Sequence, residues 1–92
     1  MSVNTVEGKD KGKVMLYALS TCGWCKKTKG LLNELGVAYS YTDVDTLTGA
    51  ERESVMDEVR KWNSACSFPT LVINGSNRIV GFQEDEIRNI LK

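Results

Sequence analysis

The 92-residue chain contains no histidine, so it lacks the commonest general base and the commonest metal ligand. Hydrolytic sites built on Ser–His or Cys–His pairs are therefore excluded. Its 12 basic and 12 acidic residues give a formal net charge of zero, so no strong field attracts nucleic acid or a membrane surface. No basic groove interleaved with aromatic residues is evident either, so no nucleic-acid partner is expected.

Long apolar segments are also missing, and the chain has only three cysteines and one proline. Without an N-terminal apolar segment or a membrane-length run, we expect neither a signal peptide nor a membrane span. Three cysteines are too few, and odd in number, for a secreted disulfide scaffold. These absences predict a single small domain that works in a reducing cytoplasm, with no membrane partner.

The most informative motif is the segment Cys22-Gly23-Trp24-Cys25. It lies where an apolar run, residues 14–19, gives way to a helical pattern that begins near Trp24. Two thiols at this spacing on the first turn of a helix can form a disulfide, and the N–H groups and dipole of the helix favour a thiolate there. A C-x-x-C motif in a β-α-β pattern is typical of a thioredoxin-like redox site.

Within this motif Cys22 is the expected nucleophile, because it lies at the helix N-terminus, where free N–H groups stabilise a thiolate. Cys25 lies one turn further in and is the expected resolving thiol, which attacks the mixed disulfide. Three lysines follow on the same helix, and some of them add positive potential: Lys26, Lys27 and Lys29. The alternative is a zinc or iron–sulfur knuckle, which is disfavoured because a zinc site needs four ligands and only Cys66 remains.

Periodicity predicts the order β-α-β-α-β-β-α. The apolar run fits a strand buried on both faces, and a helix starting at Thr21 or Cys22 ends at Gly36. A two-faced strand follows over residues 37–41. The second helix opens with the capping-box sequence Thr48-Gly49-Ala50-Glu51, and strands over residues 70–73 and 78–80 precede the last helix. Residues 1–12 are polar and aperiodic, so we expect a flexible leader before a domain over residues 13–92.

The only proline, Pro69, precedes a predicted strand in the segment Phe68-Pro69-Thr70. A proline at the entry to a strand is common and needs no functional explanation. The alternative is a cis Phe68–Pro69 bond that turns backbone groups towards the sulfurs. Cis bonds are only about 5–6% of X–Pro bonds, but a position beyond the second helix of a chain with a C-x-x-C motif favours this alternative.

Together, the order of elements, the Cys22–Cys25 motif, the Phe68-Pro69-Thr70 turn and the step from Gly81 to Phe82 resemble a dithiol glutaredoxin over residues 15–92. The resemblance implies an α/β thioredoxin fold, with a four-stranded mixed sheet flanked by helices. It also implies thiol–disulfide exchange, with Cys22 as nucleophile, Cys25 as resolving cysteine and Pro69 as a cis proline. Phe68 would pair its backbone with the thiol ligand. The residues expected to bind substrate or thiol are Thr21, Gly23, Trp24, Lys26, Phe68, Pro69, Thr70, Gly81 and Phe82.

The chain departs from the glutaredoxin pattern at two places that concern glutathione. Leu19 stands where many glutaredoxins have a lysine for a glutathione carboxylate. Residues 81–85 replace the Gly-Gly-x-Asp-Asp segment that binds the γ-glutamyl end, and look more like redoxins that thioredoxin reductase reduces. The resemblance therefore leaves glutathione, another low-molecular-weight thiol and a thioredoxin-reductase-like protein as alternative reductants.

A third departure is Gly23, where many dithiol glutaredoxins have proline. Some family members without that proline hold a [2Fe–2S] cluster between two subunits, with the first cysteine and a glutathione thiolate as ligands. The resemblance thus implies a monomeric oxidoreductase with no obligatory cofactor, acting on disulfide-bearing proteins or glutathione-type mixed disulfides. Its alternative is a cluster carrier in which Cys22 is the metal ligand. An adaptor with a degenerate thioredoxin fold is disfavoured because both cysteines are present. Cys66 is either an ordinary loop thiol with no role, or a third redox partner or a point of oxidative dimerisation.

Overall fold

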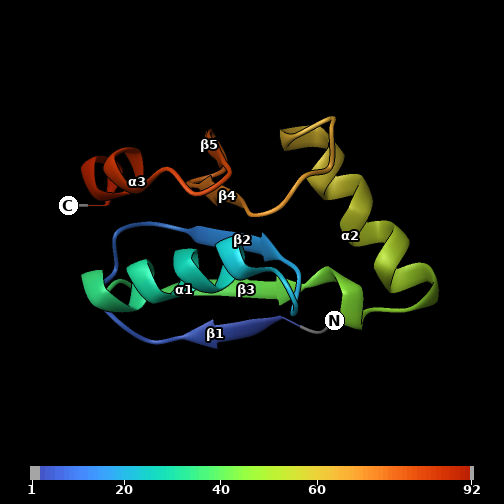
Figure 1. Ribbon diagram of the computed structural model, residues 1–92, viewed down its shortest axis with the longest axis horizontal. Helices are drawn as coiled ribbons and strands as arrows, with labels where there is room; N and C mark the ends of the chain where they lie inside the picture. The colour runs from blue at the N-terminus through green and yellow to red at the C-terminus, as the bar shows by residue number, and fades with distance from the viewer. Residues whose placement is uncertain (1–2, 92) are drawn as a thin grey trace.

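The centre of the molecule is a five-stranded mixed sheet in the order β1-β3-β2-β4-β5 (Figure 1). The computed structural model describes residues 3–91. The strands are β1 (Asn4–Val6), β2 (Val14–Ala18), β3 (Tyr39–Asp43), β4 (Thr70–Ile73) and β5 (Asn77–Val80). The central strand β2 runs parallel to β3 and antiparallel to β4, and the outer pairs β1–β3 and β4–β5 are antiparallel. This is the thioredoxin fold that the resemblance implies, with five strands in place of four.

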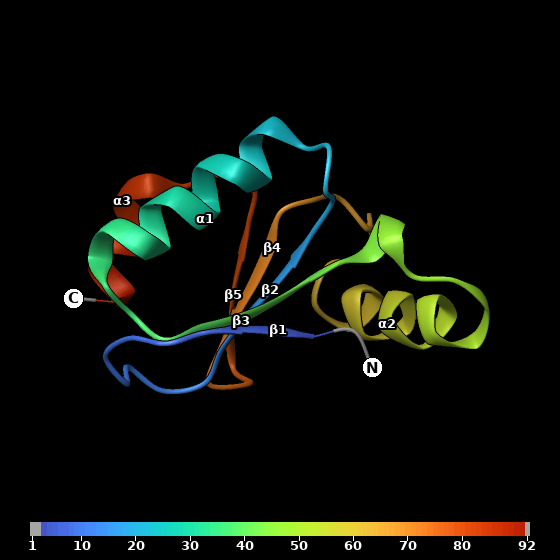
Figure 2. The ribbon, with the colours of Figure 1, turned by 90° about the horizontal axis from the view of Figure 1, so that it is seen from below.

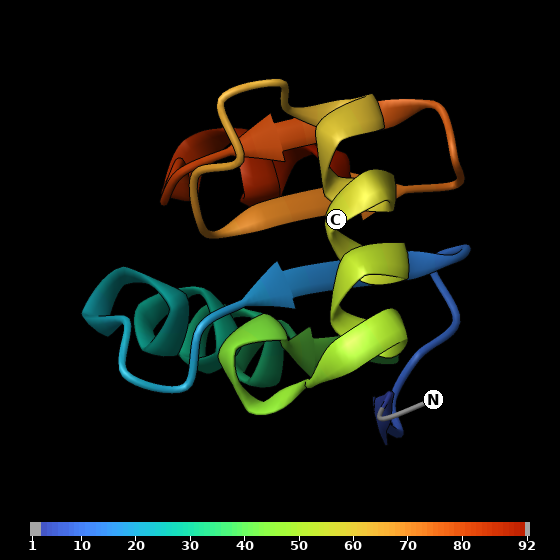
Figure 3. The same ribbon diagram turned by 90° about the vertical axis from the view of Figure 1, so that its right-hand side faces the viewer.

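Helices cover both faces of the sheet (Figure 2). The helices are α1 (Gly23–Leu35), α2 (Gly49–Trp62) and α3 (Glu84–Ile90), with a short 3-10 turn, η1 (Val44–Thr46), after β3. α1 and α3 lie together on one face, and α2 crosses the other face, as the side view shows (Figure 3). No helix within residues 3–91 is long and apolar enough to cross a membrane.

Strand β2 contributes side chains to both layers of the core. Leu16 and Ala18 are fully buried in the cluster between the sheet and α1 with α3. Tyr17 is buried in the second cluster, between the sheet and α2. Because successive strand residues point to opposite faces, burial on both sides explains the unbroken apolar sequence of this strand. This strand ends four residues before Cys22, so the rigid centre of the sheet leads directly into the cysteine motif.

Helix α1 begins and ends at the residues that the sequence indicates. Cys22 is its N-cap, with extended backbone angles. Gly36 is its C-cap in the left-handed conformation, with φ of 69°, and its N–H donates a hydrogen bond to the Asn33 carbonyl. A left-handed C-terminal residue is most easily glycine, because glycine has no Cβ to clash.

The predicted sheet is one strand short. Asn4–Val6, within the predicted leader, pairs antiparallel with Tyr39–Tyr41 and forms the fifth strand, β1. The segment that follows is also attached, because Lys9 exchanges backbone hydrogen bonds of 2.8 Å with Gly36 and Ala38. A Cβ at Gly8 would lie 2.6 Å from the Gly36 carbonyl oxygen, so this close approach requires glycine. The division of the chain at residue 12 stays a prediction, but part of the segment before it belongs to the sheet.

The capping box predicted at the start of α2 does not form in full. Thr48 is the N-cap residue, as predicted, but its side chain makes no capping hydrogen bond. The first helical residue, Gly49, has a φ of 59°, which is outside the helical region and accessible chiefly to glycine. The local sequence therefore placed the helix start correctly and its hydrogen bonding incorrectly.

Candidate active site

Cys22 is held by backbone hydrogen bonds at the junction between the β2–α1 loop and α1. Its N–H donates to the Leu19 carbonyl at 3.2 Å, and its carbonyl accepts from the Lys26 N–H at 3.1 Å. Its Sγ accepts a hydrogen bond of 3.2 Å from the Cys25 N–H. The side chain is half-buried. A sulfur that accepts an amide hydrogen bond at a helix N-terminus is in a setting that stabilises the thiolate form.

Cys25 has a different environment, although it lies only one helical turn away. Its side chain is fully buried in the cluster between the sheet and α1 with α3. Burial, assisted by the hydrogen bond with Cys22, raises the pKa of the Cys25 thiol from 9.0 to about 12. Cys25 therefore stays protonated across the physiological pH range, and the two thiols of the motif are chemically distinct.

The loop before Cys22 is attached to η1 by Ser20. The Ser20 N–H and hydroxyl donate to the two carboxylate oxygens of Asp45, at 2.8 and 2.5 Å. These two hydrogen bonds lower the pKa of Asp45 below its ordinary value, because they favour the charged carboxylate. Asp45 thus fixes the segment that leads into Cys22, a role that the sequence pattern did not indicate.

We expect this contact to make the stability of the protein depend on pH. A carboxyl group whose pKa is lower in the folded state stabilises the fold above its unfolded pKa, about 3.9 for aspartate. This stabilisation is lost as the pH falls through the folded-state pKa. In urea unfolding, wild type should exceed Asp45→Asn in stability at pH 7, and the difference should shrink below about pH 4. Glu53→Gln, on the exposed face of α2, is the control, and a difference that stays constant down to pH 2 would contradict the prediction.

A small groove lies beside the start of α1. The Phe68–Pro69 peptide bond is cis, as one of the two interpretations of the sequence predicted. The Gly81 N–H donates to the Pro69 carbonyl at 2.9 Å, which joins the proline turn to the end of β5. Trp24 and Phe82 stack with their ring centres 5.9 Å apart. The groove has a volume of about 230 Å³ and is lined by Trp24, Phe68, Pro69, Gly81 and Phe82.

The comparisons with known proteins agree with this geometry. The family model described as Glutaredoxin matches residues 14–77, which contain the cysteine motif, the cis proline and the strands β2, β3 and β4. The chain belongs to the glutaredoxin family.

Solved structures and a curated relative of this glutaredoxin extend over most of its length. It is 55% identical to a glutaredoxin from Methanosarcina mazei Go1, with a TM-score of 0.90 over 97% of this chain and 86% of that chain. It is 48% identical to Methanosarcina acetivorans methanoredoxin, with a TM-score of 0.89 over 91% and 88% of the two chains. It is also 32% identical to an uncharacterized glutaredoxin-like 8.6 kDa protein in the rubredoxin operon of Clostridium pasteurianum, over 86% of this chain and 97% of that protein.

The structure brings most of the predicted site residues of this glutaredoxin together. Five of them line the groove, and Thr21, Gly23 and Lys26 are exposed around the start of α1. Thr70 lies elsewhere: it is fully buried, its hydroxyl donates to the Ser67 carbonyl at 2.8 Å, and it accepts from the Asn63 side chain at 3.3 Å. These contacts hold the loop before Pro69 in shape.

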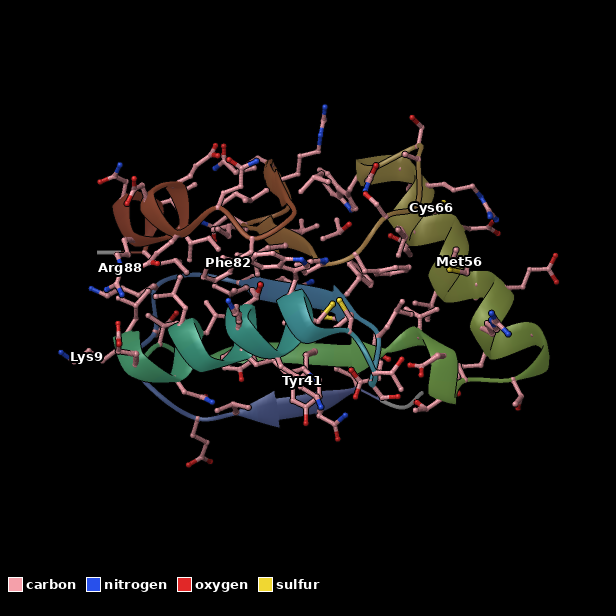
Figure 4. All side chains as sticks on the ribbon, in the orientation of Figure 1. Lys9, Tyr41, Met56, Cys66, Phe82 and Arg88 are labelled. Atoms are coloured by element: carbon pink, nitrogen blue, oxygen red, sulfur yellow. The ribbon has the colours of Figure 1, made fainter. Side chains whose placement is uncertain are left out.

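Two further features lie apart from the groove. Cys66 lies beside the C-terminal end of α2 (Figure 4) and packs on the cluster between the sheet and α2, whereas Cys22 and Cys25 belong to the opposite cluster. Phe68 contacts both clusters. A larger cavity of about 370 Å³ also lies on the α2 side, lined in part by Met15, Tyr17 and Trp62. The smaller groove is the better candidate for a substrate site, because Trp24 of the cysteine motif lines it, whereas no residue of that motif lines the larger cavity.

Proposed function

We propose that this glutaredoxin is a thiol–disulfide oxidoreductase that reduces protein disulfides, or mixed disulfides with small thiols, through Cys22 and Cys25. The observation that carries the proposal is the difference between the two thiols. One is half-buried at a helix N-terminus and accepts an amide hydrogen bond, and the other is fully buried with a raised pKa. Nucleophilic attack suits the first, and resolution from within the protein suits the second.

The reaction requires two exchanges. The Cys22 thiolate attacks one sulfur of the substrate disulfide, whose S–S bond breaks, and the departing thiolate takes a proton from solvent. Cys25 then loses its proton and attacks the Cys22 sulfur of the mixed disulfide. A Cys22–Cys25 disulfide forms, and the second substrate thiol leaves in reduced form. Two electrons pass to the substrate, and a thiol reductant later restores the dithiol.

The groove supports this proposal because it offers backbone and aromatic surface next to the motif. We infer that the part of the substrate next to its sulfur lies against the stacked rings of Trp24 and Phe82, along the backbone of Phe68. Trp24 is 58% exposed, so it is available to contact a substrate. None of the five lining residues is charged, and the Lys27 Nζ lies 4.7 Å from the centre of the Trp24 ring, which forms part of the groove wall. Glutathione, another low-molecular-weight thiol or a thioredoxin-reductase-like protein would be the reductant, and a cytoplasmic monomer would be the working form.

A cluster-carrying role would need ligands from outside this chain. Within residues 3–91, no three His, Cys, Asp or Glu side chains are grouped so that they could hold a metal ion. Cys22 would be the ligand from each of two subunits, with a small thiol completing the set. Iron reconstitution separates the two roles: a cluster carrier becomes a brown dimer that loses its colour with Cys22→Ser, whereas an oxidoreductase alone stays colourless.

The proposal predicts different end products for the wild type and for Cys25→Ser. Each protein is reduced and then mixed with a peptide that contains one intramolecular disulfide. Wild type should reduce the peptide and end with its own Cys22–Cys25 disulfide. Cys25→Ser cannot resolve the intermediate, so it should end as a covalent adduct with the peptide through Cys22, which mass spectrometry of proteolytic fragments detects.

Two controls complete this experiment. Cys66→Ser should behave like wild type, because Cys66 packs on the other side of the sheet. Cys25→Ser mixed with a glutathionylated peptide should release the peptide thiol and keep glutathione on Cys22. Added glutathione should then release the reduced enzyme, as glutathione disulfide forms, if glutathione is the reductant. Absence of any adduct, or an adduct formed through Cys66, would show that the proposed division of roles is wrong.

A further inference from the structure

An ion pair lies one turn along α1 from Cys25. Lys29 is four residues after Cys25, so the two side chains share a helix face, with Cβ atoms roughly 5–6 Å apart. The Lys29 Nζ lies 2.9 Å from an Asp43 carboxylate oxygen and 4.2 Å from the centre of the Tyr41 ring. The two charged side chains are only 21% and 18% exposed, in contrast to the more exposed ion pairs on α2 and α3. Tyr41 lies on β3 beside α1 (Figure 4).

The sheet fixes the position of this pair relative to the cysteine motif. Asp43 is the last residue of β3, and its register partner is Ala18, the last residue of β2. Ala18 is four residues before Cys22. The carboxylate therefore lies at the edge of the sheet from which the active-site loop leaves, and the lysine bridges this edge to α1.

The second exchange of the proposed reaction requires that Cys25 lose its proton. Cys25 must attack as a thiolate, yet its sulfur is buried and its pKa is about 12. The positive charge of Lys29 acts in the opposite direction and lowers the pKa of Cys25. The other charged groups on neighbouring elements are occupied or exposed: Asp45 binds Ser20, Arg88 pairs with Glu34 and Glu84, and Lys26 and Lys27 are exposed on α1.

We propose that Lys29, held by Asp43 and the Tyr41 ring, supports the resolving step by placing a fixed positive charge beside Cys25 as it attacks the mixed disulfide. This inference rests on the proposed dithiol function. Asp43 and Tyr41 restrict the flexible lysine side chain, and the carboxylate offsets part of its charge. Both members of the ion pair are positioning residues, because neither contacts the substrate or exchanges electrons. Cys25 loses its proton to solvent, its sulfur bonds to Cys22, and the substrate thiolate leaves.

The resolving step can be followed separately from the first attack. Reduced protein carrying Cys66→Ser is mixed with an equimolar amount of 5,5′-dithiobis(2-nitrobenzoate) in a stopped-flow instrument. Attack by Cys22 releases one coloured thiolate, and attack by Cys25 on the mixed disulfide releases a second. The rate of the second phase is measured from pH 6 to pH 9 for this parent and for Lys29→Met, Lys29→Arg and Asp43→Asn added to it.

The rate of the second phase is expected to fall in Lys29→Met and to rise in Asp43→Asn. Loss of a nearby opposite charge raises the pKa of a thiol, and a rise of one pKa unit leaves about tenfold less thiolate. The remaining thiolate is more nucleophilic, by about threefold for a Brønsted coefficient of 0.4–0.5. The second phase of Lys29→Met should therefore slow by about threefold to fourfold. Lys29→Arg should stay close to the parent. Asp43→Asn should be faster, because the Tyr41 ring and the asparagine oxygen still hold the lysine while its charge is no longer offset.

Each outcome has a definite meaning. Slowing in both Lys29→Met and Asp43→Asn would show that the pair only maintains the local structure, and the proposal would be overturned. An unchanged second phase in Lys29→Met would also overturn it. Lys61→Met, which removes an exposed lysine from α2, is the matched control and should leave both phases unchanged. If the parent itself showed no second phase, the dithiol function would fail instead, so the two failures are distinguishable.

Discussion

Replacing Cys22 with serine should abolish disulfide reduction and leave the fold intact. A serine hydroxyl is not ionised at neutral pH and does not exchange with a disulfide, so the first bond to substrate cannot form. Turnover of a disulfide-containing peptide should fall to the rate of uncatalysed exchange with the reductant. The buried Cys25 cannot replace Cys22, because its pKa is about 12 and its side chain has no exposed surface.

The same substitution is expected to be structurally mild. Cys22 is the N-cap of α1 and accepts the Cys25 N–H, and serine is among the preferred residues for this position. The free energy of unfolding of the reduced protein should therefore change by less than about 1 kcal/mol. Turnover and denaturant unfolding are measured on the same preparations. Activity that survives in Cys22→Ser but disappears in Cys22→Ser/Cys66→Ser would identify Cys66 as the nucleophile and contradict the assignment.

The parts of the site that were predictable are those encoded within a few residues. The spacing of Cys22 and Cys25 places one thiol at the N-cap and the other a turn inside, and Gly36 marks the end of the helix. The alternation of β2 side chains is hidden in the sequence because both faces are buried, but the apolar run itself predicts that burial. The sequence left two alternatives for Pro69, a cis bond or an ordinary proline at the entry to a strand. The structure shows the cis bond, in a turn whose Pro69 carbonyl accepts a hydrogen bond from the Gly81 N–H.

The parts that were missed depend on contacts between distant segments. Asn4–Val6 is a short, polar strand with no apolar period, and only the edge of β3 makes it a strand. Ser20 and Asp45 are 25 residues apart and exposed, so no local pattern joins them. The i, i+4 spacing of Cys25 and Lys29 was present in the sequence as a signal. The sequence could not show that Asp43 pairs with Lys29, because the position of Asp43 is fixed by the parallel pairing of β2 and β3.

The fold therefore determines how different the two cysteines are. The motif alone sets their spacing, whereas the depth of Cys25 is set by the packing of α1 on β2 and α3. This packing keeps the Cys25 thiol protonated, and in the proposed mechanism Lys29 of α1, held by Asp43 at the end of β3, places a positive charge beside it. A change that loosens the packing should then affect both stability and the distinction between the two thiols.

Leu16→Ala is expected to cause the largest loss of stability among single core substitutions of this kind. Leu16 is fully buried in the middle of β2, paired with Tyr41 on one side and Leu71 on the other, and it packs in the cluster that also contains Leu32, Ile87 and Cys25. Truncating a buried leucine to alanine costs about 2–5 kcal/mol, because apolar contacts are lost and a cavity remains. A domain of this size has a total stability of roughly 5–14 kcal/mol, so the loss is a large share of the whole.

Ile90→Ala provides the matched comparison. Because Ile90 is 38% exposed at the end of α3, its truncation should lower the free energy of unfolding by less than Leu16→Ala does. Urea unfolding of the reduced proteins at pH 7 measures both free energies, and each lost kcal/mol should lower Tm by about 4–8 °C. Because Leu16 and Cys25 share one cluster, Leu16→Ala should also make the Cys25 thiol react faster with a small alkylating reagent in a Cys22→Ser/Cys66→Ser background, whereas Ile90→Ala should not. Equal losses of stability in the two variants would show that the centre of the sheet is not the main source of stability, and would remove the structural basis for the protection of Cys25.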